Sequence, residues 1–323
     1  TDLALSATSI AENTSGGGLV VGTATPTDSD QPSGGAYVFA LGGTDASSFS
    51  INTSSGELSL TSAANYESKA SYSINVLVTD AGGKTYTEAF TITVTDVNEA
   101  PAFASATDTG SVAENAAATT VIYTAVATDV DASGTIEYSI SGGNDAALVE
   151  IDSSSGEVTL KSSANYEAKS SYAFTVAASD GSLSDTIDVT VSVSDVDEAS
   201  SISGDTTGSV TEDGTQTASG TLTITDVDAD DSPTFTAETV AGTYGSLQIG
   251  TNGAWTYTLD NSDADTNVLD AGDSVTDTVT VSASDGTSED VTITITGAND
   301  APVFASATDT GSVAENAAAT TVI

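Results

Sequence analysis

Three observations predict an all-β protein built from antiparallel β-sandwiches arranged end to end. First, apolar and mostly β-branched residues alternate with hydroxyl residues, as in segments 90–94, 190–194 and 291–295, which is typical of strands with one buried face. Second, clusters of Gly, Ser, Asn and Asp interrupt these segments about every 8–12 residues, as turns between short strands do. Third, motifs recur about every 100 residues, a length that can bury its own core.

The recurring motifs define the expected domains. Asn-Tyr-Glu stands at 65–67 and again at 165–167, and Ala-Glu-Asn at 11–13, 113–115 and 314–316. Segment 100–122 is nearly identical to segment 301–323. A fixed period of this kind indicates an array of similar units. We expect repeats at 1–99, 100–199 and 200–300, and at 301–323 the first strands of a truncated further repeat.

The second repeat illustrates the expected sandwich. Alternation and turn signals predict seven strands, at 111–113, 121–127, 136–140, 149–151, 157–160, 172–178 and 186–193. Seven short strands with turns between them are typical of two packed antiparallel sheets. The phase of the alternation places Tyr172, Phe174 and Val176 on one face. We expect that face to be the core.

Composition excludes several classes of function. The chain has 47 acidic residues against four lysines, and its net charge is −43. No basic surface is available for nucleic acid or for an anionic membrane. There is no Cys and no His, so disulfides, zinc–thiolate sites and Ser-His-Asp catalysis are excluded. No apolar run is long enough to span a bilayer. Carboxylate, hydroxyl and carbonyl oxygens remain, and these are ligands for hard cations, above all Ca²⁺.

The acidic residues gather at strand ends and turns. In a sandwich, alternate strand ends meet at one pole, so carboxylates from the bottom of one repeat face those from the top of the next. At the first junction we expect seven carboxylates, with Asn65 and Asn98 as neutral donors: Glu12, Glu67, Asp96, Glu99, Asp129, Asp131 and Asp180. At the bottom of the second repeat we expect Glu114, Asn165, Glu167, Asp195, Asp197 and Glu198. Such crowded anions predict bound Ca²⁺.

These motifs resemble the cadherin family in its bacterial surface-protein form. The resemblance rests on Ala-Glu-Asn, Asp-x-Asp at 28–30 and 129–131, Asn-Tyr-Glu, the late Asp80 and Asp180, and Asp-Val-Asn-Glu-Ala-Pro at 96–101. It implies Ca²⁺ clusters at the junctions, with Asp28, Asp30 and Asp80 as ligands at the top of the first repeat, and an extracellular adhesive role. Asn65 and Asn165 depart from the family, which usually has Asp there, and the second linker, 195–200, lacks the Pro.

The third repeat differs in its motifs. Gly-Ser-Val-Thr-Glu-Asp-Gly at 208–214, Tyr-Gly-Ser-Leu at 244–247 and Gly-Ala-Trp-Thr-Tyr at 253–257 resemble the VCBS repeat, an immunoglobulin-like sandwich of large RTX-type bacterial adhesins. By position we expect Asp226, Asp228 and Asp285 as its upper ligands. Its expected lower ligands are Glu212, Asn299 and Asp300.

Three features leave alternatives open. Tyr66 and Tyr166 are expected in the core or at a corner rather than in a binding site. Trp255 is expected in the core, with an exposed sugar-stacking platform as the alternative. The aspartates at 260, 263, 265 and 270 form either an ion site or a solvated acidic loop.

The expected function is a Ca²⁺-binding extender of a bacterial cell-surface adhesin, without enzymatic activity. Its partners are neighbouring repeats of the same chain, with a glycan or protein target elsewhere in the full protein. The alternative is an adhesive module that binds carbohydrate or protein through the loops of one repeat.

Overall fold

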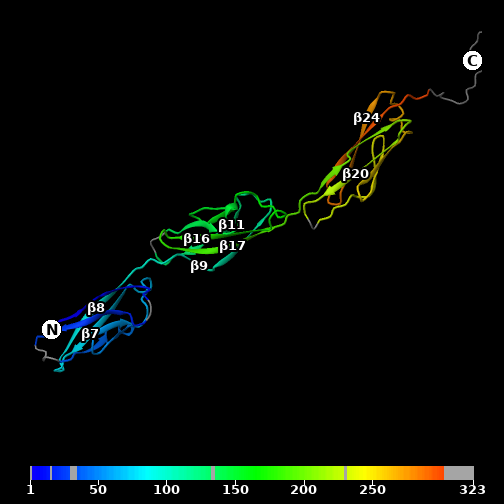
Figure 1. The fold of residues 1–323 in the computed structure, drawn as a ribbon. Coiled ribbons are helices and arrows are strands. Elements are labelled where there is room, and N and C mark those ends of the chain that lie inside the picture. Colours follow the sequence, from blue (N-terminus) through cyan, green and yellow to red (C-terminus); the bar gives the residue numbers. More distant parts are fainter. Residues whose placement is uncertain (1, 15–16, 30–34, 132–134, 229–230, 302–323) are drawn as a thin grey trace, which may run out of the picture. The chain divides into compact units, whose positions relative to one another are not determined.

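The computed structural model describes residues 2–14, 17–29, 35–131, 135–228 and 231–301 (Figure 1). The chain divides into two compact units, Thr1–Asp195 and Val196–Ile323. Asp30 and the expected truncated repeat, apart from Ala301, lie outside the described residues. Among the residues described, no helix is long and apolar enough to cross a bilayer.

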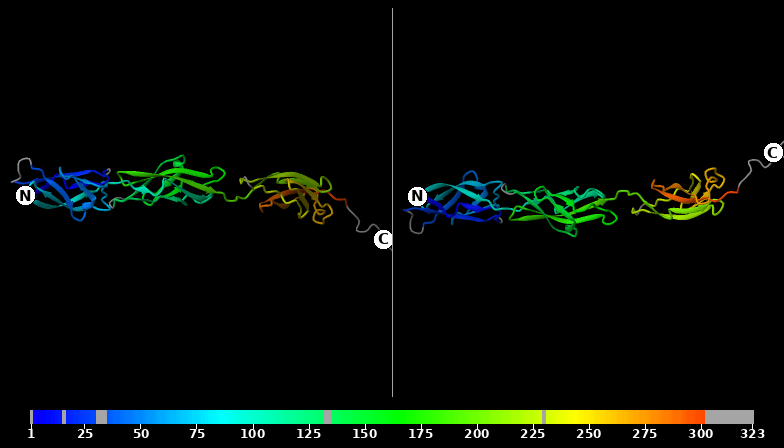
Figure 2. Two further views of the ribbon diagram at one scale, coloured as in Figure 1. Left: turned by 90° about the horizontal axis from the view of Figure 1, so that it is seen from below. Right: turned by 90° about the horizontal axis from the view of Figure 1, so that it is seen from above.

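The first unit contains two β-sandwiches, and this confirms the predicted fold class. The first sandwich packs two four-stranded sheets, β1-β3-β6-β5 and β2-β8-β7-β4, face to face (Figures 1 and 2). Their bounds are β1 Asp2–Leu5, β2 Ser9–Ala11, β3 Val20–Thr27, β4 Val38–Gly42, β5 Phe49–Ile51, β6 Glu57–Leu60, β7 Ser71–Thr79 and β8 Thr85–Thr95. Leu58, Val76 and Ile92 are fully buried between the sheets.

The second sandwich repeats this plan. Its main sheet is β10-β17-β16-β13, opposed by β11-β15-β14 and the short pair β12-β9. The bounds are β9 Ala102–Phe103, β10 Thr107–Ala113, β11 Val121–Thr124, β12 Ala127–Thr128, β13 Glu137–Gly142, β14 Val149–Ile151, β15 Glu157–Leu160, β16 Ser171–Ser179 and β17 Ser184–Ser194. Tyr172, Phe174 and Val176 are buried, as predicted.

The second unit holds the third sandwich. A five-stranded sheet, β18-β20-β23-β22-β21, packs on the three-stranded sheet β19-β25-β24. The bounds are β18 Ser201–Gly204, β19 Thr207–Thr211, β20 Thr217–Thr225, β21 Glu238–Ala241, β22 Gly245–Ile249, β23 Ala254–Leu259, β24 Ser274–Ser282 and β25 Ser288–Thr296. Trp255 is 1% exposed and its Nε1 donates to the Asp205 carbonyl at 2.9 Å, so it is a core residue and not a sugar platform.

Tyr66 and Tyr166 were expected in the core or at a corner, and the structure excludes the core. They are 37% and 38% exposed, so they do not belong to the core. Instead, their backbone N–H groups donate to the buried glutamates Glu12 and Glu114. The backbone of the motif is therefore held by these buried glutamates.

One strand pair in each sandwich is parallel, within otherwise antiparallel sheets. β2 pairs with β8, β10 with β17 and β19 with β25 in this way. Parallel strands end at the same edge of a sheet. The residue that follows the early strand of each pair therefore lies close to the linker that follows the last strand of the repeat. This pairing positions the candidate site.

Candidate metal centres

A buried glutamate follows the early strand of each parallel pair. Glu12, Glu114 and Glu212 are only 2%, 2% and 1% exposed. Each donates its backbone N–H to the last residue of the partner strand, at 3.2, 3.0 and 3.0 Å. The next residue is left-handed in all three cases, at Asn13, Asn115 and Asp213, with φ between 54° and 57°. Asn and Asp tolerate this region better than other non-glycine residues, so the turn is encoded locally.

In the first repeat, Glu12 gathers a loop and a linker. Its carboxylate accepts hydrogen bonds from the backbone N–H of Tyr66 at 2.6 Å and of Val97 at 2.8 Å. These bonds, above all that from Tyr66, hold the pKa of Glu12 below its usual value against the opposing effect of burial. Carboxylate oxygens of Glu12, Glu67 and Asp96 lie within 4.8 Å of one another.

A second group joins the first repeat to the second within the same unit. Carboxylate oxygens of Glu67, Glu99 and Asp131 lie within 4.8 Å of one another. The Glu99 backbone N–H donates to Asp131 at 2.7 Å, and the Asp131 N–H donates to Asp129 at 3.0 Å. The linker and the Asp-x-Asp turn therefore hold each other in place.

The neutral donors also lie at this junction. Asn98 Nδ2 donates to Asp180 Oδ2 at 2.8 Å, and Asn65 Nδ2 donates to Glu67 Oε2 at 3.1 Å. Asn13, which was not predicted, donates to Glu99. All nine residues expected at the first junction thus take part in one connected acidic region.

The crowding of anions perturbs two carboxyl groups. Burial, followed by the charges of Asp131 and Glu12, raises the pKa of Asp96. Burial and the charge of Glu12 raise the pKa of Glu99. Among the described residues the ion pairs are Lys69 with Asp45 and Lys169 with Asp145, so no lysine neutralises the first junction there.

Two buried oxygens at this junction lack a partner. Glu99 Oε2 and Asp129 Oδ2 are inaccessible to solvent and contact no hydrogen-bond donor in the described part of the chain. A buried carboxylate oxygen without a partner is costly. Ca²⁺–oxygen distances of 2.3–2.6 Å allow two ligands of one ion to be about 5 Å apart, so both three-carboxylate groups fit this ion. The residues present therefore suit Ca²⁺.

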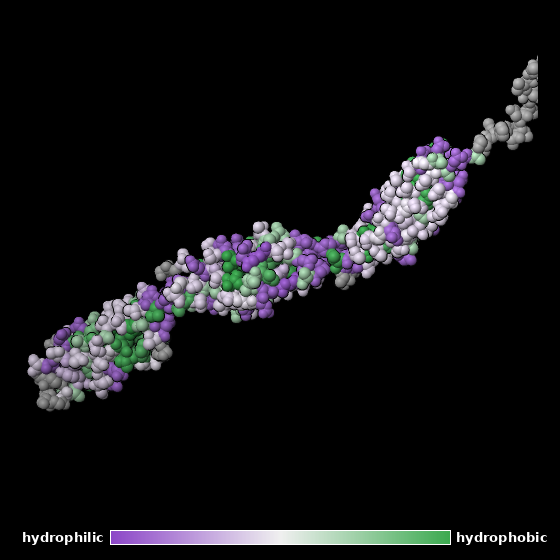
Figure 3. Space-filling view, turned by 45° about the horizontal axis from the view of Figure 1, so that its top comes forward, coloured by the Kyte–Doolittle hydropathy of each residue, from purple (hydrophilic) through white to green (hydrophobic). Residues whose placement is uncertain are grey.

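The bottom of the second repeat reproduces the first cluster. Glu114 accepts the Tyr166 N–H at 2.8 Å. Carboxylate oxygens of Glu114, Glu167 and Asp195 lie within 4.8 Å of one another. The Asn165 side-chain oxygen accepts the Ala168 N–H at 2.7 Å, which shapes the loop. Hydrophilic residues gather at this end of the second sandwich in Figure 3.

The second unit carries its own acidic group. Asp197, Asp228 and Asp231 present carboxylate oxygens within 4.8 Å of one another. Asp231 was not predicted, because the first two repeats have no acidic residue at that position. Its signal was the acidic run that continues after Asp226-Val227-Asp228 and in which Asp231 is the fourth aspartate. The neighbouring Asp197 carboxylate raises the pKa of Asp231.

Asp285 accepts hydrogen bonds from the linker residue Ser200 and from its own turn. Ser200 Oγ donates to it at 2.6 Å, and Thr287 donates through both N–H and hydroxyl, at 2.9 and 3.1 Å. These bonds, above all that from Ser200, lower its pKa to about 2. Asp226 accepts the Asp228 N–H at 3.1 Å and so shapes the turn.

The remaining predicted ligands form no group of three carboxylates within the described ranges. Glu212 accepts the Ala298 N–H at 3.1 Å, and Asn299 donates to the Asp300 carbonyl at 3.2 Å. Asp28 and Asp80 line a small cavity of about 40 Å³ at the top of the first repeat. Asp80 accepts the Lys84 N–H at 2.7 Å.

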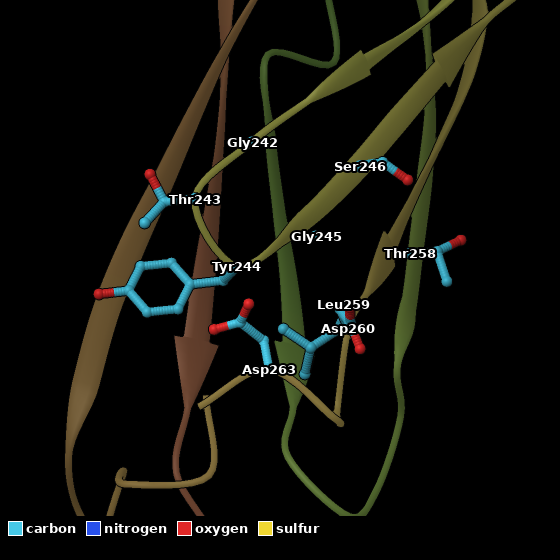
Figure 4. A pocket seen from close by; sticks show the side chains of 9 residues that line it. All are labelled: Gly242, Thr243, Tyr244, Gly245, Ser246, Thr258, Leu259, Asp260 and Asp263. Atoms are coloured by element: carbon cyan, nitrogen blue, oxygen red, sulfur yellow. The ribbon is translucent and has the colours of Figure 1, made fainter. Parts of the chain in front are cut away.

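The third repeat has a surface cavity of about 420 Å³, beside the turn at 242–245 and residues 258–260 and 263 (Figure 4). Asp263 and Tyr244 both line this cavity (Figure 4). The turn is held by Asp277, 1% exposed, which accepts the N–H of Thr243 and of Tyr244 and the Tyr257 hydroxyl. By strand register, Tyr72 and Tyr172 occupy the equivalent position in the other repeats.

The raised pKa values predict an unusual pH dependence. Asp96 and Glu99 bind protons more tightly in the folded chain than in the unfolded one, so their contribution to stability falls as pH rises through those raised values. Glu12 and Asp180 have lowered pKa values and lose their contribution only below about pH 4. In chelator, the unfolding temperature of the first unit should rise as the pH falls toward the raised pKa values of these two carboxyl groups.

Calorimetry across this pH range measures the effect. Asp96→Asn is the matched variant, because it keeps the shape and removes the titrating group. The variant should show a weaker dependence of unfolding temperature on pH than the parent chain. An equal slope in the variant would assign the effect to general charge repulsion instead.

Comparisons with known proteins point to one family. The cadherin domain model matches residues 6–95 and 108–194, together more than half of the chain. The bacterial cadherin-like domain model matches residues 197–297.

Curated relatives with similar sequences include protocadherins. The chain is 30% identical to protocadherin Fat 4 of Mus musculus over 192 residues, and 30% identical to protocadherin Fat 1 of Homo sapiens over 234 residues. These matches cover 58% and 69% of this chain but only 4% and 5% of the relatives. The chain thus spans a small part of their length.

Solved structures share the fold. Mouse cadherin-23 EC22-24 aligns with a TM-score of 0.60 at 19% identity, over 91% of this chain and 96% of that one. Mouse protocadherin-24 EC1-3 aligns with a TM-score of 0.55 at 20% identity, over 92% and 98%.

Proposed function

Because this chain belongs to the cadherin family, we propose that it is a Ca²⁺-binding extender segment of an extracellular adhesion protein. Its acidic clusters bind Ca²⁺ where successive repeats meet. Ion binding there limits the motion of one sandwich against the next. The segment carries no enzymatic activity in this proposal.

The observation that carries the proposal is the carboxylate group Glu67, Glu99 and Asp131. Glu67 belongs to the first repeat, Glu99 to the linker and Asp131 to the second repeat. One cation bound by all three would tie these segments together. No lysine substitutes for the cation among the described residues of this group.

The residues of the first junction have different roles. Glu12 fixes the loop of Glu67 and the start of the linker through two backbone N–H groups. Asp131 fixes the end of the linker through the Glu99 N–H. A bound Ca²⁺ supplies the positive charge that offsets the carboxylates and accepts six to eight oxygen ligands. The neutral Asn98 holds Asp180 within the cluster.

Small-angle scattering tests the proposal. With millimolar Ca²⁺ the chain should show a larger maximum dimension and less flexibility than in chelator, because the junctions are locked only when cations offset their charge. Asp131→Asn should weaken the Ca²⁺ response, since it removes one charge from the bridging group. Identical scattering curves with and without chelator would contradict the proposal.

The finer assignment follows from the motifs. We propose that the full protein is a large bacterial surface adhesin of the RTX type, that residues 200–300 are a VCBS-type repeat, and that the array supports attachment and biofilm formation. The proposal includes the division of the chain into repeats at 1–99, 100–199 and 200–300 and the start of a further repeat at 301–323. The bacterial cadherin-like match over residues 197–297 supports a bacterial source.

A second candidate function is ligand binding by the third repeat. The cavity lined by Tyr244 and Asp263 favours it. The buried Asp277, which stands where the other repeats have Tyr72 and Tyr172, holds the turn beside this cavity. Aromatic and carboxylate groups together suit a sugar. A glycan array probed with the whole chain distinguishes this candidate from the extender.

A further inference from the structure

One strand of the second repeat is left partly uncovered where its counterpart in the first repeat is covered. In the first repeat β1 pairs with β3 over residues 24–27, and Ser6 extends this contact by donating its N–H to the Thr23 carbonyl at 3.1 Å. In the second repeat β9 pairs with β12 over two residues only. The uncovered stretch is 124–126, at the end of β11 and before β12.

The backbone hydrogen bonds allow this comparison residue by residue. Ala24 and Ala125 are equivalent, because each donates its N–H at 2.9 Å to the carbonyl of the glycine that precedes β6 or β15. Thr124 is therefore the counterpart of Thr23. Within this described stretch of the chain, no hydrogen bond joins Thr124 to segment 104–107. The edge of the strand is thus open at Thr124.

A glycine in the first repeat explains the difference. At Gly22 a Cβ would lie 2.9 Å from the backbone nitrogen of Ala7, so the close approach of the two segments requires glycine. By register with β6 and β15, Tyr123 stands in the position of Gly22. A side chain there prevents the same approach. The segment that leads from the first strand to the parallel strand is two residues longer in the second repeat, 103–112 against 3–10.

A cavity of about 560 Å³ lies beside the uncovered stretch. This volume is within the range of roughly 300–1,000 Å³ that is usual for ligand pockets. Its lining combines the open strand edge with apolar side chains and includes Phe103, Tyr123, Thr124, Val126 and Ile187. Val126 is 68% exposed, so an apolar side chain of the cavity wall is available to a partner.

Two further lining residues indicate what the cavity would accept. Ser105 is the counterpart of Leu5, which packs against the core of the first repeat, so an apolar side chain is missing there. Asp108 is exposed and accepts the Thr109 N–H at 2.8 Å and the Tyr123 hydroxyl at 3.3 Å. Among the described residues no lysine forms an ion pair with Asp108. The cavity therefore suits one apolar and one positively charged side chain.

The charge of the chain argues against a second copy as the occupant. The net charge is −43, and segment 301–323, which nearly repeats segment 100–122, contains no Lys or Arg. Lys69 and Lys169, two of the four lysines, already form ion pairs within the chain. A partner segment that carries Lys or Arg has the complementary charge. Open strand edges are recognised by extended peptides that add a strand.

We propose that this cavity of the second repeat binds an extended, basic peptide segment of a partner protein. The segment pairs its backbone with the edge at Thr124 and Val126. It places an apolar side chain beside Ser105 and a Lys or Arg side chain beside Asp108. This interaction goes beyond the extender role, and the lining of the cavity shares no residue with the groups of three carboxylates.

Fluorescence anisotropy tests the proposal with a labelled synthetic peptide, Ser-Lys-Val-Thr-Leu-Thr-Lys-Ser, added to the whole chain. The parent chain should bind it both in Ca²⁺ and in chelator. Asp108→Asn should weaken binding about tenfold, the effect of losing one charge-assisted hydrogen bond. Ser105→Leu should abolish binding, because the chain itself then supplies the side chain that Leu5 supplies in the first repeat. Glu150→Gln, exposed in β14 of the same repeat, is the control for loss of one charge.

Two control peptides define the mode of binding. The peptide with Glu in place of both Lys should not bind, and neither should the peptide N-methylated at alternate residues, since it cannot pair with a strand edge. Binding that persists in Ser105→Leu or after N-methylation overturns the proposal, as does a parent chain that does not bind. None of these results bears on Ca²⁺ at the junctions.

Sedimentation velocity of the chain without peptide examines the other occupant. The parent chain should be monomeric. A dimer that Ser105→Leu abolishes would make a second copy the occupant and would overturn the proposal. Circular dichroism verifies that each variant is folded.

Discussion

Removing Ca²⁺ with excess chelator is expected to lower the unfolding temperature of the chain by about 10 °C or more. At free Ca²⁺ about 100-fold above Kd, each independent site adds about 2.7 kcal/mol to stability. For a domain of roughly 100 residues, 1 kcal/mol corresponds to about 4–8 °C. The first junction alone holds two groups of three carboxylates that share Glu67. Differential scanning calorimetry with and without chelator measures the shift.

Magnesium is the matched control for this experiment. It carries the same charge but demands a small octahedron and keeps its water, so it should restore only part of the lost stability. Full restoration by Mg²⁺ or by raised NaCl would show that general screening, and not a defined site, offsets the carboxylates. An unchanged unfolding temperature in chelator would contradict ion binding at the junctions.

Trp255→Ala is expected to destabilise the third repeat by about 3–5 kcal/mol, the usual cost of truncating a buried Trp. Trp255 is 1% exposed and packs in a core with Leu222, Tyr257 and Ile293. The variant also leaves the Asp205 carbonyl without its indole donor. Urea unfolding followed by circular dichroism measures the loss.

Trp255→Phe is the companion variant. It keeps most of the apolar volume but loses the hydrogen bond, so it should cost less than the alanine variant. The transitions of the first two repeats should not move, because their cores contain none of the same residues. A small effect of Trp255→Ala would show that the third core does not depend on this side chain.

The fold was predictable because its signal is repeated and local. Alternation along 172–176 identified the buried face, and the turns between strands gave the sandwich. The parallel pairing of β2, β10 and β19 was not predictable, since a period of two residues fixes which face is buried but not the direction of the neighbouring strand. The expected strand at 121–127 is divided into β11 and β12, and Val126 between them is 68% exposed.

The site was predictable only where a motif recurs. Glu12 and Glu114, Glu67 and Glu167, and Asp131 were recognised through repetition and ligand chemistry, and the structure brings them into acidic groups. Asp231 has no counterpart in the other repeats, so repetition could not reveal it. The hydrogen bonds that Asp285 accepts from Ser200 and Thr287 could not be predicted from the sequence. They depend on the path of the linker in three dimensions.

The parallel strand pairs have a mechanical consequence. Tension between the two ends of a repeat pulls the two strands of its parallel pair in opposite directions along their length, so the hydrogen bonds joining them are sheared together and not opened one at a time. The register spans three residue pairs in β2–β8, seven in β10–β17 and five in β19–β25. Because its parallel register is the longest, we expect the second repeat to unfold at the highest force and the first repeat at a lower one.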